Sequence, residues 1–275
     1  MGVGLLTGKN ALVSGVANSK SIALGIAQVF REQGARVALT CLESTQRRVA
    51  KLAAELGSDL VLPCDVTKDE DVARTFAEVG RAFDGKLDIL VHSIAYARME
   101  EMSGEFLNVT REGWRLALDV SAYSLVAMAR GARPLMKAAG GGSVMALTFV
   151  GGTRVAPGYN MMGVAKAALE CTVRYLAYDL GPDGIRVNAL SPGPIPTVSA
   201  MVIEGFDESL QTLATRSPLL RPVSPRDVGN AASFYAADLS RAITGATVYV
   251  DGGMNVLAAG AGVHPRAGKP AAERP

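Results

Sequence analysis

The sequence predicts an α/β protein in which a single domain forms a doubly wound, parallel, seven-stranded sheet of the Rossmann type. Short apolar runs rich in β-branched residues alternate with longer amphipathic runs over residues 10–257. Strands that are separated by helices need crossover connections, and these produce parallel pairing. No repeat or linker-like segment divides residues 1–257, and the 275 residues, 49% of them apolar, suffice for one large core.

Hydrophobic periodicity places the individual elements. Strands are predicted at 11–13, 36–40, 60–62, 88–91, 143–147, 185–188 and 247–250. Helices are predicted at 21–32, 44–56, 69–83, 110–137 and 159–180. Residues 258–275 are rich in Ala, Gly and Pro, and we expect a disordered tail there because the segment offers too little apolar surface to bury.

Composition narrows the class of function. A net charge of +2 gives no reason to expect a nucleic-acid partner, and the three cysteines lack metal-ligand spacing, which favours core thiols and no bound metal. No apolar run approaches the roughly 20 residues that span a bilayer. The first residues show no basic region followed by an apolar one. We therefore expect a cytoplasmic protein without a membrane partner.

The first strand leads into a small-residue loop that opens a helix. Gly15 ends the strand, and Ser21 and Ile22 begin the helix, so backbone amides and the helix amino end can hold a pyrophosphate. Ser21 suits either an N-cap or a phosphate contact. The strict G-x-G-x-x-G pattern is absent, and an ordinary tight turn is the competing interpretation.

Residues that follow the next strands are candidates for the rest of a dinucleotide site. Leu42 and its neighbour Glu43 follow the second strand, where an acid commonly binds the adenosine ribose and favours NADH; Arg47 and Arg48 would suit a 2′-phosphate. A solvated helix start explains these charges equally well. The other candidates follow the third and fourth strands: Asp65, Val66, Ser93, Ile94 and Ala95. We interpret the preceding His92 as a core histidine.

Tyr159 and Lys166 lie seven positions apart in a segment that otherwise predicts an apolar helix. Seven steps of about 100° make nearly two turns, so both side chains point to one face. The axial rise between them is about 10 Å, which leaves room for a group between the phenol and the amine.

The chain resembles the short-chain dehydrogenase/reductase superfamily, and within it the bacterial enoyl-acyl-carrier-protein reductases that use NADH. The ordinary branch has a shorter first turn, a Tyr-x3-Lys pair and a serine thirteen residues before the tyrosine; here Gly163 and Ala146 occupy those positions. The matching motifs cover about 5–256: Ser-Ile-Ala at 21–23 and 93–95, Tyr-x6-Lys at 159–166, and the segments 188–195, 227–230, 244–245 and 250–253.

The resemblance implies reduction of trans-2-enoyl thioesters on acyl carrier protein by NADH, with NADPH less favoured, in a homotetramer. Tyr159 would stabilise the enolate. Lys166 would bind the nicotinamide ribose, and its charge would make the phenol more acidic. Ile195 and Thr197 would contact the nicotinamide. A lid around 196–216 would close on the acyl chain, although a surface helix also fits that pattern.

The substrate side is implied to consist of Ala97, Phe149, Tyr159, Met201 and Phe206. The family usually has a second tyrosine where this chain has Phe149. If that hydroxyl orients the thioester, its loss lowers turnover or shifts the substrate range; if the ring only packs, little changes. Three arginines near the lid would attract an acidic carrier or are merely solvated: Arg216, Arg221 and Arg226.

Two rival functions remain from the sequence. One is another short-chain reductase acting on an enoyl-CoA or a carbonyl substrate, which the Tyr-x6-Lys spacing and Ala146 disfavour. The other is a non-catalytic NAD-binding paralogue, supported by Phe149 and Pro196 and opposed by the intact Tyr159 and Lys166.

Overall fold

The computed structural model describes residues 4–58, 60–201, 203, 205–258 and 262–268, and it contains the predicted seven-stranded parallel sheet. The strands pair in the order β3-β2-β1-β4-β5-β6-β7, and each neighbouring pair is parallel. Their bounds are β1 (Asn10–Val13), β2 (Arg36–Cys41), β3 (Val61–Pro63), β4 (Ile89–His92), β5 (Gly142–Leu147), β6 (Ile185–Pro192) and β7 (Thr247–Val250). The predicted doubly wound fold is confirmed.

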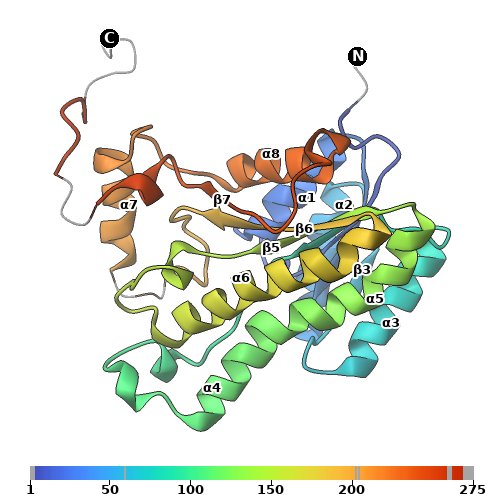
Figure 1. The fold of residues 1–275 in the computed structure, drawn as a ribbon, viewed down its shortest axis with the longest axis horizontal. Coiled ribbons are helices and arrows are strands. Elements are labelled where there is room, and N and C mark those ends of the chain that lie inside the picture. The colour runs from blue at the N-terminus through green and yellow to red at the C-terminus, as the bar shows by residue number, and fades with distance from the viewer. Residues whose placement is uncertain (1–3, 59, 202, 204, 259–261, 269–275) are drawn as a thin grey trace.

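Helices cover both faces of this sheet (Figure 1). One buried cluster lies under α1 (Ile22–Glu32), α2 (Gln46–Glu55) and α8 (Pro225–Ala236). A second buried cluster lies on the opposite face under α3 (Asp69–Ala82), α5 (Ser124–Ala138) and α6 (Asn160–Leu180). Because both faces are covered, the strands carry nearly continuous apolar sequence, which is the pattern from which they are predicted.

Helix α8 is an element that the periodicity analysis missed. Its signal is local: the Ser224 hydroxyl accepts from the Asp227 N–H at 3.2 Å, and the Asp227 carboxylate accepts from the Ser224 N–H at 2.9 Å. This capping box closes the helix start. Two glycines then let α8 cross α1 closely, since a Cβ on Gly25 would meet Pro225 Cβ at 2.4 Å and one on Gly229 would meet Val29 at 2.7 Å.

The single helix predicted over 110–137 is wrong in its middle. The structure has α4 (Arg111–Leu118), a π-helical turn at Asp119–Tyr123, and then α5. The turn brings two hydroxyls to β4 and the segment after it: Ser124 Oγ lies 2.7 Å from His92 Nε2, and Ser121 Oγ accepts from the Tyr96 N–H at 3.0 Å. These long-range contacts leave no periodic trace in the sequence.

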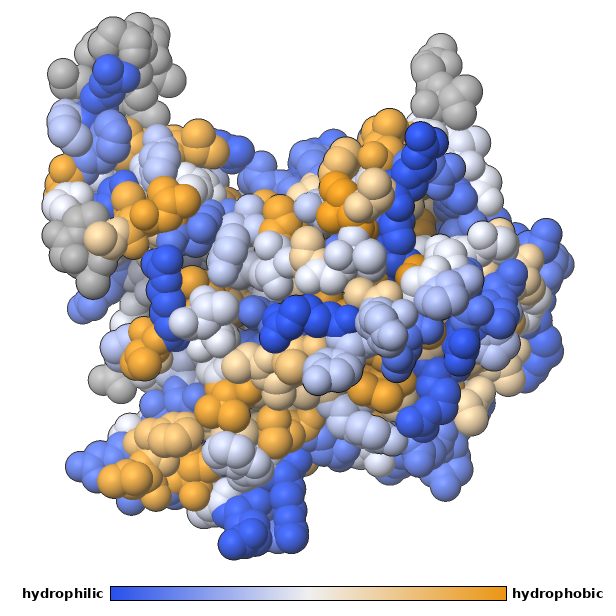
Figure 2. Space-filling view, viewed as in Figure 1, coloured by the Kyte–Doolittle hydropathy of each residue, from blue (hydrophilic) through white to orange (hydrophobic). Residues whose placement is uncertain are grey.

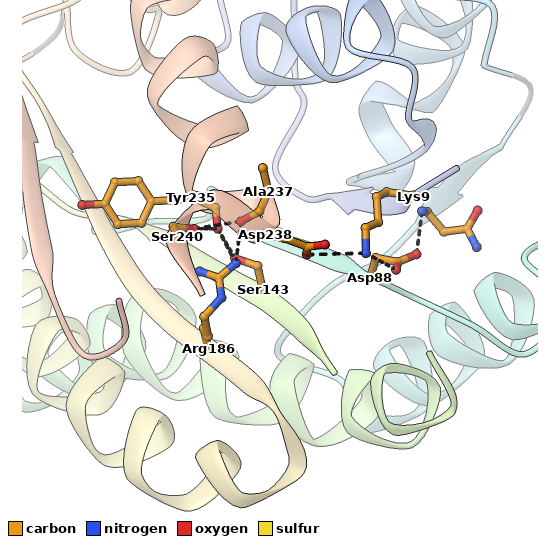
Figure 3. Close-up of polar contacts among 9 residues, drawn as sticks. Lys9, Asp88, Ser143, Arg186, Tyr235, Ala237, Asp238 and Ser240 are labelled. Atoms are coloured by element: carbon orange, nitrogen blue, oxygen red, sulfur yellow. Dashed lines mark hydrogen bonds and ion pairs between the residues drawn. The ribbon is translucent and has the colours of Figure 1, made fainter. Parts of the chain in front are cut away.

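The amino ends of the strands are held by a polar network on the edge of the sheet away from the predicted site (Figure 3). Arg186, at the start of β6, donates to the Tyr235 carbonyl oxygen at 2.8 Å, and Ser143, at the start of β5, donates to the same oxygen at 2.9 Å. Lys9 pairs with Asp88 at 3.3 Å. This network fixes the end of α8 against β5 and β6.

Within the residues that the structure describes, none of the helices combines the length and apolar character needed to cross a membrane. The predicted disorder of 258–275 falls partly on 259–261 and 269–275, which lie outside the described residues. Within 262–268, the His264 N–H donates to the Thr215 carbonyl oxygen of α7 (Phe206–Arg216) at 2.9 Å. Disorder of this segment stays a prediction.

Candidate active site

The carboxyl ends of β1 and β4 meet in a close backbone contact. Gly15 has a φ of +83°, and a Cβ there would lie 1.9 Å from the Ser93 carbonyl oxygen. The Ser14 hydroxyl ties the same strands by donating to the Val91 carbonyl oxygen at 2.7 Å. Only glycine fits this position. β1 and β4 flank the point where the strand order reverses, which is where doubly wound sheets bind ligands.

The loop between Gly15 and α1 is closed by Ser21. The Ser21 hydroxyl accepts from the backbone N–H groups of Ala17 and Asn18, both at 3.1 Å. Ser21 is the N-cap residue of α1, which confirms its predicted position, although its hydroxyl makes no side-chain capping bond. Ile22 begins α1 and packs on the core. The first turn of α1 has no acidic residue, so its positive amino end suits a phosphate.

The candidate adenosine residues follow β2 and β3 on the same edge. Leu42 is exposed and Val66 is buried. Asp65 Oδ1 accepts from the Thr67 hydroxyl at 2.7 Å and from its N–H at 3.1 Å. These hydrogen bonds lower the pKa of Asp65, and the bond from the Thr67 hydroxyl has the largest effect. The carboxylate is therefore ionised and anchored within its own turn.

β4 ends in a buried histidine, and several small residues follow it. His92 is fully buried, and its Nε2 forms a 2.7 Å hydrogen bond with Ser124 Oγ, which confirms the core interpretation. Burial lowers the pKa of His92 to about 3, so the ring is neutral. Ile94 packs on the core, Ala95 is exposed, and Ala97 packs beside Tyr159.

Tyr159 lies immediately before α6, in a small apolar cluster with Met102, Met162 and Ala165. Its hydroxyl forms no hydrogen bond within the described part of the chain, so it is available to an incoming acceptor. Burial raises the pKa of this phenol well above its ordinary value. The expected acidification by the nearby ammonium is therefore wrong, because desolvation dominates. Tyr159 is a neutral hydrogen-bond donor near pH 7.

Lys166 lies two turns further along α6 and is only 5% exposed. Its Nζ donates to the Leu147 carbonyl oxygen, at the end of β5, at 2.7 Å. Burial lowers the pKa of Lys166 to about 8, and the carboxylate of Glu170 opposes this shift. Near neutral pH the amine thus remains mostly charged, at the carboxyl edge of the sheet.

Phe149 forms the wall between Tyr159 and a cavity of about 660 Å³. The two rings pack edge to face, with centroids 5.0 Å apart and an interplanar angle of 66°. The cavity is also lined by Arg154, which follows the same loop, and by Arg216, at the end of α7. Phe149 thus lacks the hydroxyl that the resemblance implies, but its ring packs on the catalytic candidate.

The candidate nicotinamide residues follow β6. Ile195 is buried in the core and Thr197 is half-buried. A tight turn joins them, because the Thr197 N–H donates to the Ile195 carbonyl oxygen at 2.7 Å. The Thr197 hydroxyl accepts from the Ala200 N–H at 3.1 Å and so fixes the chain that enters the proposed lid.

The proposed lid contacts the Tyr159 cluster through one residue that was not among the predicted site residues. Ile203 packs against this cluster. Phe206, at the start of α7, is buried, whereas Met201 is 51% exposed. The run of apolar residues in the sequence predicts a lid, but it does not predict which of these residues packs against the Tyr159 cluster.

Further residues of the site were also missed. Met162 and Ala165 share helical spacing with Tyr159 on α6, a signal that the sequence does contain. Met102 comes from a distant loop and leaves no such signal. Glu170, four residues after Lys166, is buried and accepts from the Thr148 hydroxyl at 2.7 Å.

This arrangement combines a neutral phenol donor, a buried amine and a helix amino end that suits a dinucleotide phosphate. Tyr159 is available to a developing negative charge on a substrate oxygen. Lys166, with three donors, suits vicinal hydroxyls. The described residues thus provide for hydride transfer to an unsaturated substrate in an apolar pocket.

Comparisons with known proteins agree with this chemistry. A family model described as enoyl-(acyl carrier protein) reductase matches residues 15–255. The enoyl-acyl-carrier-protein reductase (NADH) FabI of Aquifex aeolicus is 46% identical over 258 residues, which are 93% of this chain and 94% of that protein.

Two solved structures share the fold. The Bacillus cereus enoyl-acyl carrier protein reductase, in complex with NADP+ and indole naphthyridinone, has a TM-score of 0.90 and 44% identity over 93% of this chain and 99% of its own. The Anaplasma phagocytophilum reductase in complex with NAD has a TM-score of 0.88 and 42% identity, covering 92% and 96%. This chain belongs to the enoyl-(acyl carrier protein) reductase family.

Proposed function

We propose that this chain reduces the 2,3 double bond of trans-2-enoyl-acyl-carrier-protein thioesters with NADH during fatty-acid elongation. The observation that carries the proposal concerns Tyr159, a buried residue at the start of α6 whose hydroxyl has no hydrogen-bond partner among the described residues, and the Lys166 amine two turns further along that helix. The spacing supports an enoyl rather than a carbonyl substrate, because Gly163 and Ala146 replace the residues that the carbonyl-reducing branch uses.

The carboxyl ends of β1 and β4 suit a dinucleotide. Without a Cβ, Gly15 packs directly against the Ser93 carbonyl oxygen, and the amino end of α1, whose first turn has no acidic residue, would receive the pyrophosphate. NADH, when bound, supplies the hydride. We assign Leu42, Asp65 and Val66 to its adenosine half; the list of the remaining cofactor residues is Ser21, Ile22, Ser93, Ile94, Ala95, Lys166, Ile195 and Thr197.

NADH rather than NADPH is the cofactor that the FabI relative is named for. The B. cereus structure contains NADP+, so the fold accommodates a 2′-phosphate in at least one relative. In this chain Glu43 stands next to the candidate ribose site, and its charge would repel that phosphate. Arg47 and Arg48 are exposed at the start of α2 and moderate the repulsion.

Tyr159 stabilises the charge that builds on the thioester oxygen. Its pKa is raised by burial, so the phenol keeps its proton at neutral pH and can donate a hydrogen bond to the enolate. The surrounding apolar cluster excludes water and strengthens that bond. Removal of one such donor typically costs about 10² to 10³ in turnover.

Lys166 binds the nicotinamide ribose. In this structure its Nζ donates to the Leu147 carbonyl oxygen, which directs the amine toward the carboxyl edge of β5. Ribose hydroxyl oxygens placed there would accept hydrogen bonds from the other N–H groups of the amine. The predicted space between phenol and amine is thus assigned to the cofactor.

The acyl carrier protein is proposed to approach the 660 Å³ cavity behind Phe149. Its apolar lining suits an acyl-pantetheine arm, and Arg154 and Arg216 on its wall suit the phosphate and an acidic carrier. Two other arginines are already engaged: Arg226 pairs with Glu32 at 2.6 Å and Arg221 with Asp227 at 3.3 Å.

The lid and the homotetramer are part of the proposal. The segment 196–216 would cover the acyl chain through Ile203 and Phe206, with the exposed Met201 turning inward on closure. Figure 2 shows hydrophobic side chains gathered over α4 and the segment before it. Large apolar and aromatic side chains are exposed on α4, on the segment before it and on α6, and they form surfaces suited to subunit contacts. These residues are Phe106, Leu107, Trp114, Tyr175 and Tyr178.

The test follows NADH absorbance with a dodecenoyl thioester and, separately, with a 3-oxoacyl thioester. We expect oxidation with the enoyl substrate only, and faster with the carrier-protein thioester than with the CoA thioester. Oxidation with the 3-oxoacyl thioester alone would establish the carbonyl-reductase rival. NADH binding without any turnover would establish the non-catalytic paralogue.

A Tyr159→Phe variant tests the assigned chemistry. We expect kcat to fall about 10² to 10³-fold because the enolate loses its donor, while the Kd for NADH stays unchanged. A Tyr123→Phe variant, which changes an exposed phenol that has no proposed role in catalysis or subunit contact, is the matched control. Undiminished enoyl reduction by Tyr159→Phe would remove the role given to the phenol.

A further inference from the structure

A third chemical group shares the stripe of α6 that carries Tyr159 and Lys166. Glu170 follows Tyr159 by eleven positions and Lys166 by four, and eleven steps of about 100° end near the starting direction. Its side chain is 6% exposed, and Oε1 accepts from the Thr148 hydroxyl at 2.7 Å. The proposed mechanism gives this carboxylate no task.

The carboxylate occupies a shaped pocket. Thr148, directly after β5, is 5% exposed and faces it. The turn at Val150–Gly152 closes over it, since a Cβ on Gly152 would meet Glu170 Oε1 at 3.1 Å and the backbone of Lys166 at 3.0 Å. Burying a carboxylate costs several kcal/mol unless a charge or several donors compensate, and one hydroxyl is little compensation.

Lys166 is the cation that compensates it. The two side chains form no direct ion pair, because Nζ is bonded to the Leu147 carbonyl oxygen, yet the Glu170 charge raises the pKa of Lys166 against burial. The other titratable groups around Lys166 are His92 on β4 and Tyr159 on α6, and burial keeps both neutral near pH 7. Within the described residues, Glu170 is the anion that acts on this amine.

We propose that Glu170, held by Thr148, is a positioning residue that keeps Lys166 protonated and available to the cofactor ribose. The inference rests on the proposed function for the identity of the ribose, but its geometry concerns residues of this chain alone. The amine needs its charge because a neutral lysine loses one donor and the ionic part of the hydrogen bond. The site therefore consists of phenol, ammonium and carboxylate in one line along α6.

A Glu170→Gln variant isolates the charge. The glutamine amide keeps the size of the side chain and an oxygen that accepts from Thr148, so packing and hydrogen bonding are preserved. NADH binding is measured by fluorescence from pH 6 to 10, without acyl substrate. We expect affinity in the wild type to decline with a midpoint near pH 8, and this midpoint to fall by about one pH unit or more in the variant.

The same shift in midpoint predicts how much NADH affinity changes at a fixed pH. At pH 8 the charged fraction of Lys166 falls from about one half to about one tenth, so NADH binds about fivefold more weakly to Glu170→Gln, while binding at pH 6 is unchanged. Thr172→Val is the matched control: it removes a hydroxyl of α6 that donates to the Ala168 carbonyl oxygen and leaves Glu170 and Thr148 in place, so its midpoint stays near that of the wild type.

A Lys166→Arg variant identifies the titrating group, because its guanidinium stays charged to above pH 12. We expect the alkaline decline to vanish there, and to stay absent in Lys166→Arg with Glu170→Gln. An unshifted midpoint in folded Glu170→Gln, or an equal shift in Thr172→Val, would overturn the proposal. If Glu170→Gln does not fold, Glu170→Asp, which keeps the charge, must retain the wild-type midpoint. Failure of enoyl reduction would refute the proposed function and leave these binding results valid.

Discussion

Burial, more than charge, decides what the individual residues of the site can do. Spacing alone brings Tyr159 and Lys166 to one face, but it also suggests an acidic phenol, whereas the apolar cluster around Tyr159 raises its pKa. That cluster includes Met102, which comes from a distant loop. The identity of the residues is thus predictable from sequence, and their ionisation is not.

Phe149 stands where the resemblance implies a second tyrosine, and we expect a Phe149→Tyr variant to gain activity. Its ring edge lies against Tyr159 and on the wall of the cavity, so a hydroxyl there adds a second donor near the thioester. One such hydrogen bond is worth about 1 kcal/mol, or about a fivefold rise in kcat/KM. Steady-state kinetics with an enoyl thioester measures it, with Phe149→Leu as the control for ring packing.

Two outcomes would separate the accounts of Phe149. A rise confined to Phe149→Tyr shows that the missing hydroxyl limits the reaction. Unchanged kinetics in Phe149→Tyr, together with a loss in Phe149→Leu, would show that the ring serves only to pack on Tyr159.

At the scale of elements, local signals were reliable and long-range ones were not. The apolar runs placed all seven strands, although β6 extends to Pro192 where the periodicity ends it at Asn188. The π turn at Asp119–Tyr123 was missed because its evidence is long-range: Ser121, within the turn, bonds Tyr96, and Ser124, directly after it, bonds His92. Helix α8 was missed although its Ser-x-x-Asp capping box is local and was there to be found.

The crossing of α1 and α8 depends on Gly25, and we expect Gly25→Ala to destabilise the protein. The added Cβ would lie 2.4 Å from Pro225 Cβ and 2.9 Å from its backbone, so the helices must separate. Overpacking of this kind costs about 1–3 kcal/mol, which exceeds the helix propensity gained. Urea unfolding followed by circular dichroism measures the change.

Gly181→Ala is the control for that prediction, because a Cβ on Gly181 meets nothing within 4 Å. We expect its unfolding midpoint to equal or exceed that of the wild type. Equal midpoints for Gly25→Ala and the wild type would mean that α1 and α8 adjust without loss of packing.

For the whole molecule, parallel topology explains how much of the site was predictable. Candidate residues follow β1, β2, β3, β4 and β6, and a parallel sheet places all these ends on one edge. The contact of Gly15 with Ser93, between strands adjacent only in space, needs the strand order 1-4, which the sequence of elements does not state. The same holds for Ile203 against Tyr159.

The stability of the whole molecule should depend on pH through His92, which is buried at the end of the central strand β4. Its pKa is lowered to about 3 by burial, against about 6.5 in an unfolded chain. Between these values the unfolded state binds more protons, so the free energy of unfolding falls as the pH falls, by up to about 1.4 kcal/mol per unit.

In His92→Gln, whose amide can still bond Ser124, we expect that slope to be smaller by this amount. Urea unfolding at pH 6.5, 5.5 and 4.5 measures the slope, with His264→Gln, at a histidine outside the core, as the control that keeps it. Equal slopes in the wild type and His92→Gln would show that His92 does not govern acid unfolding.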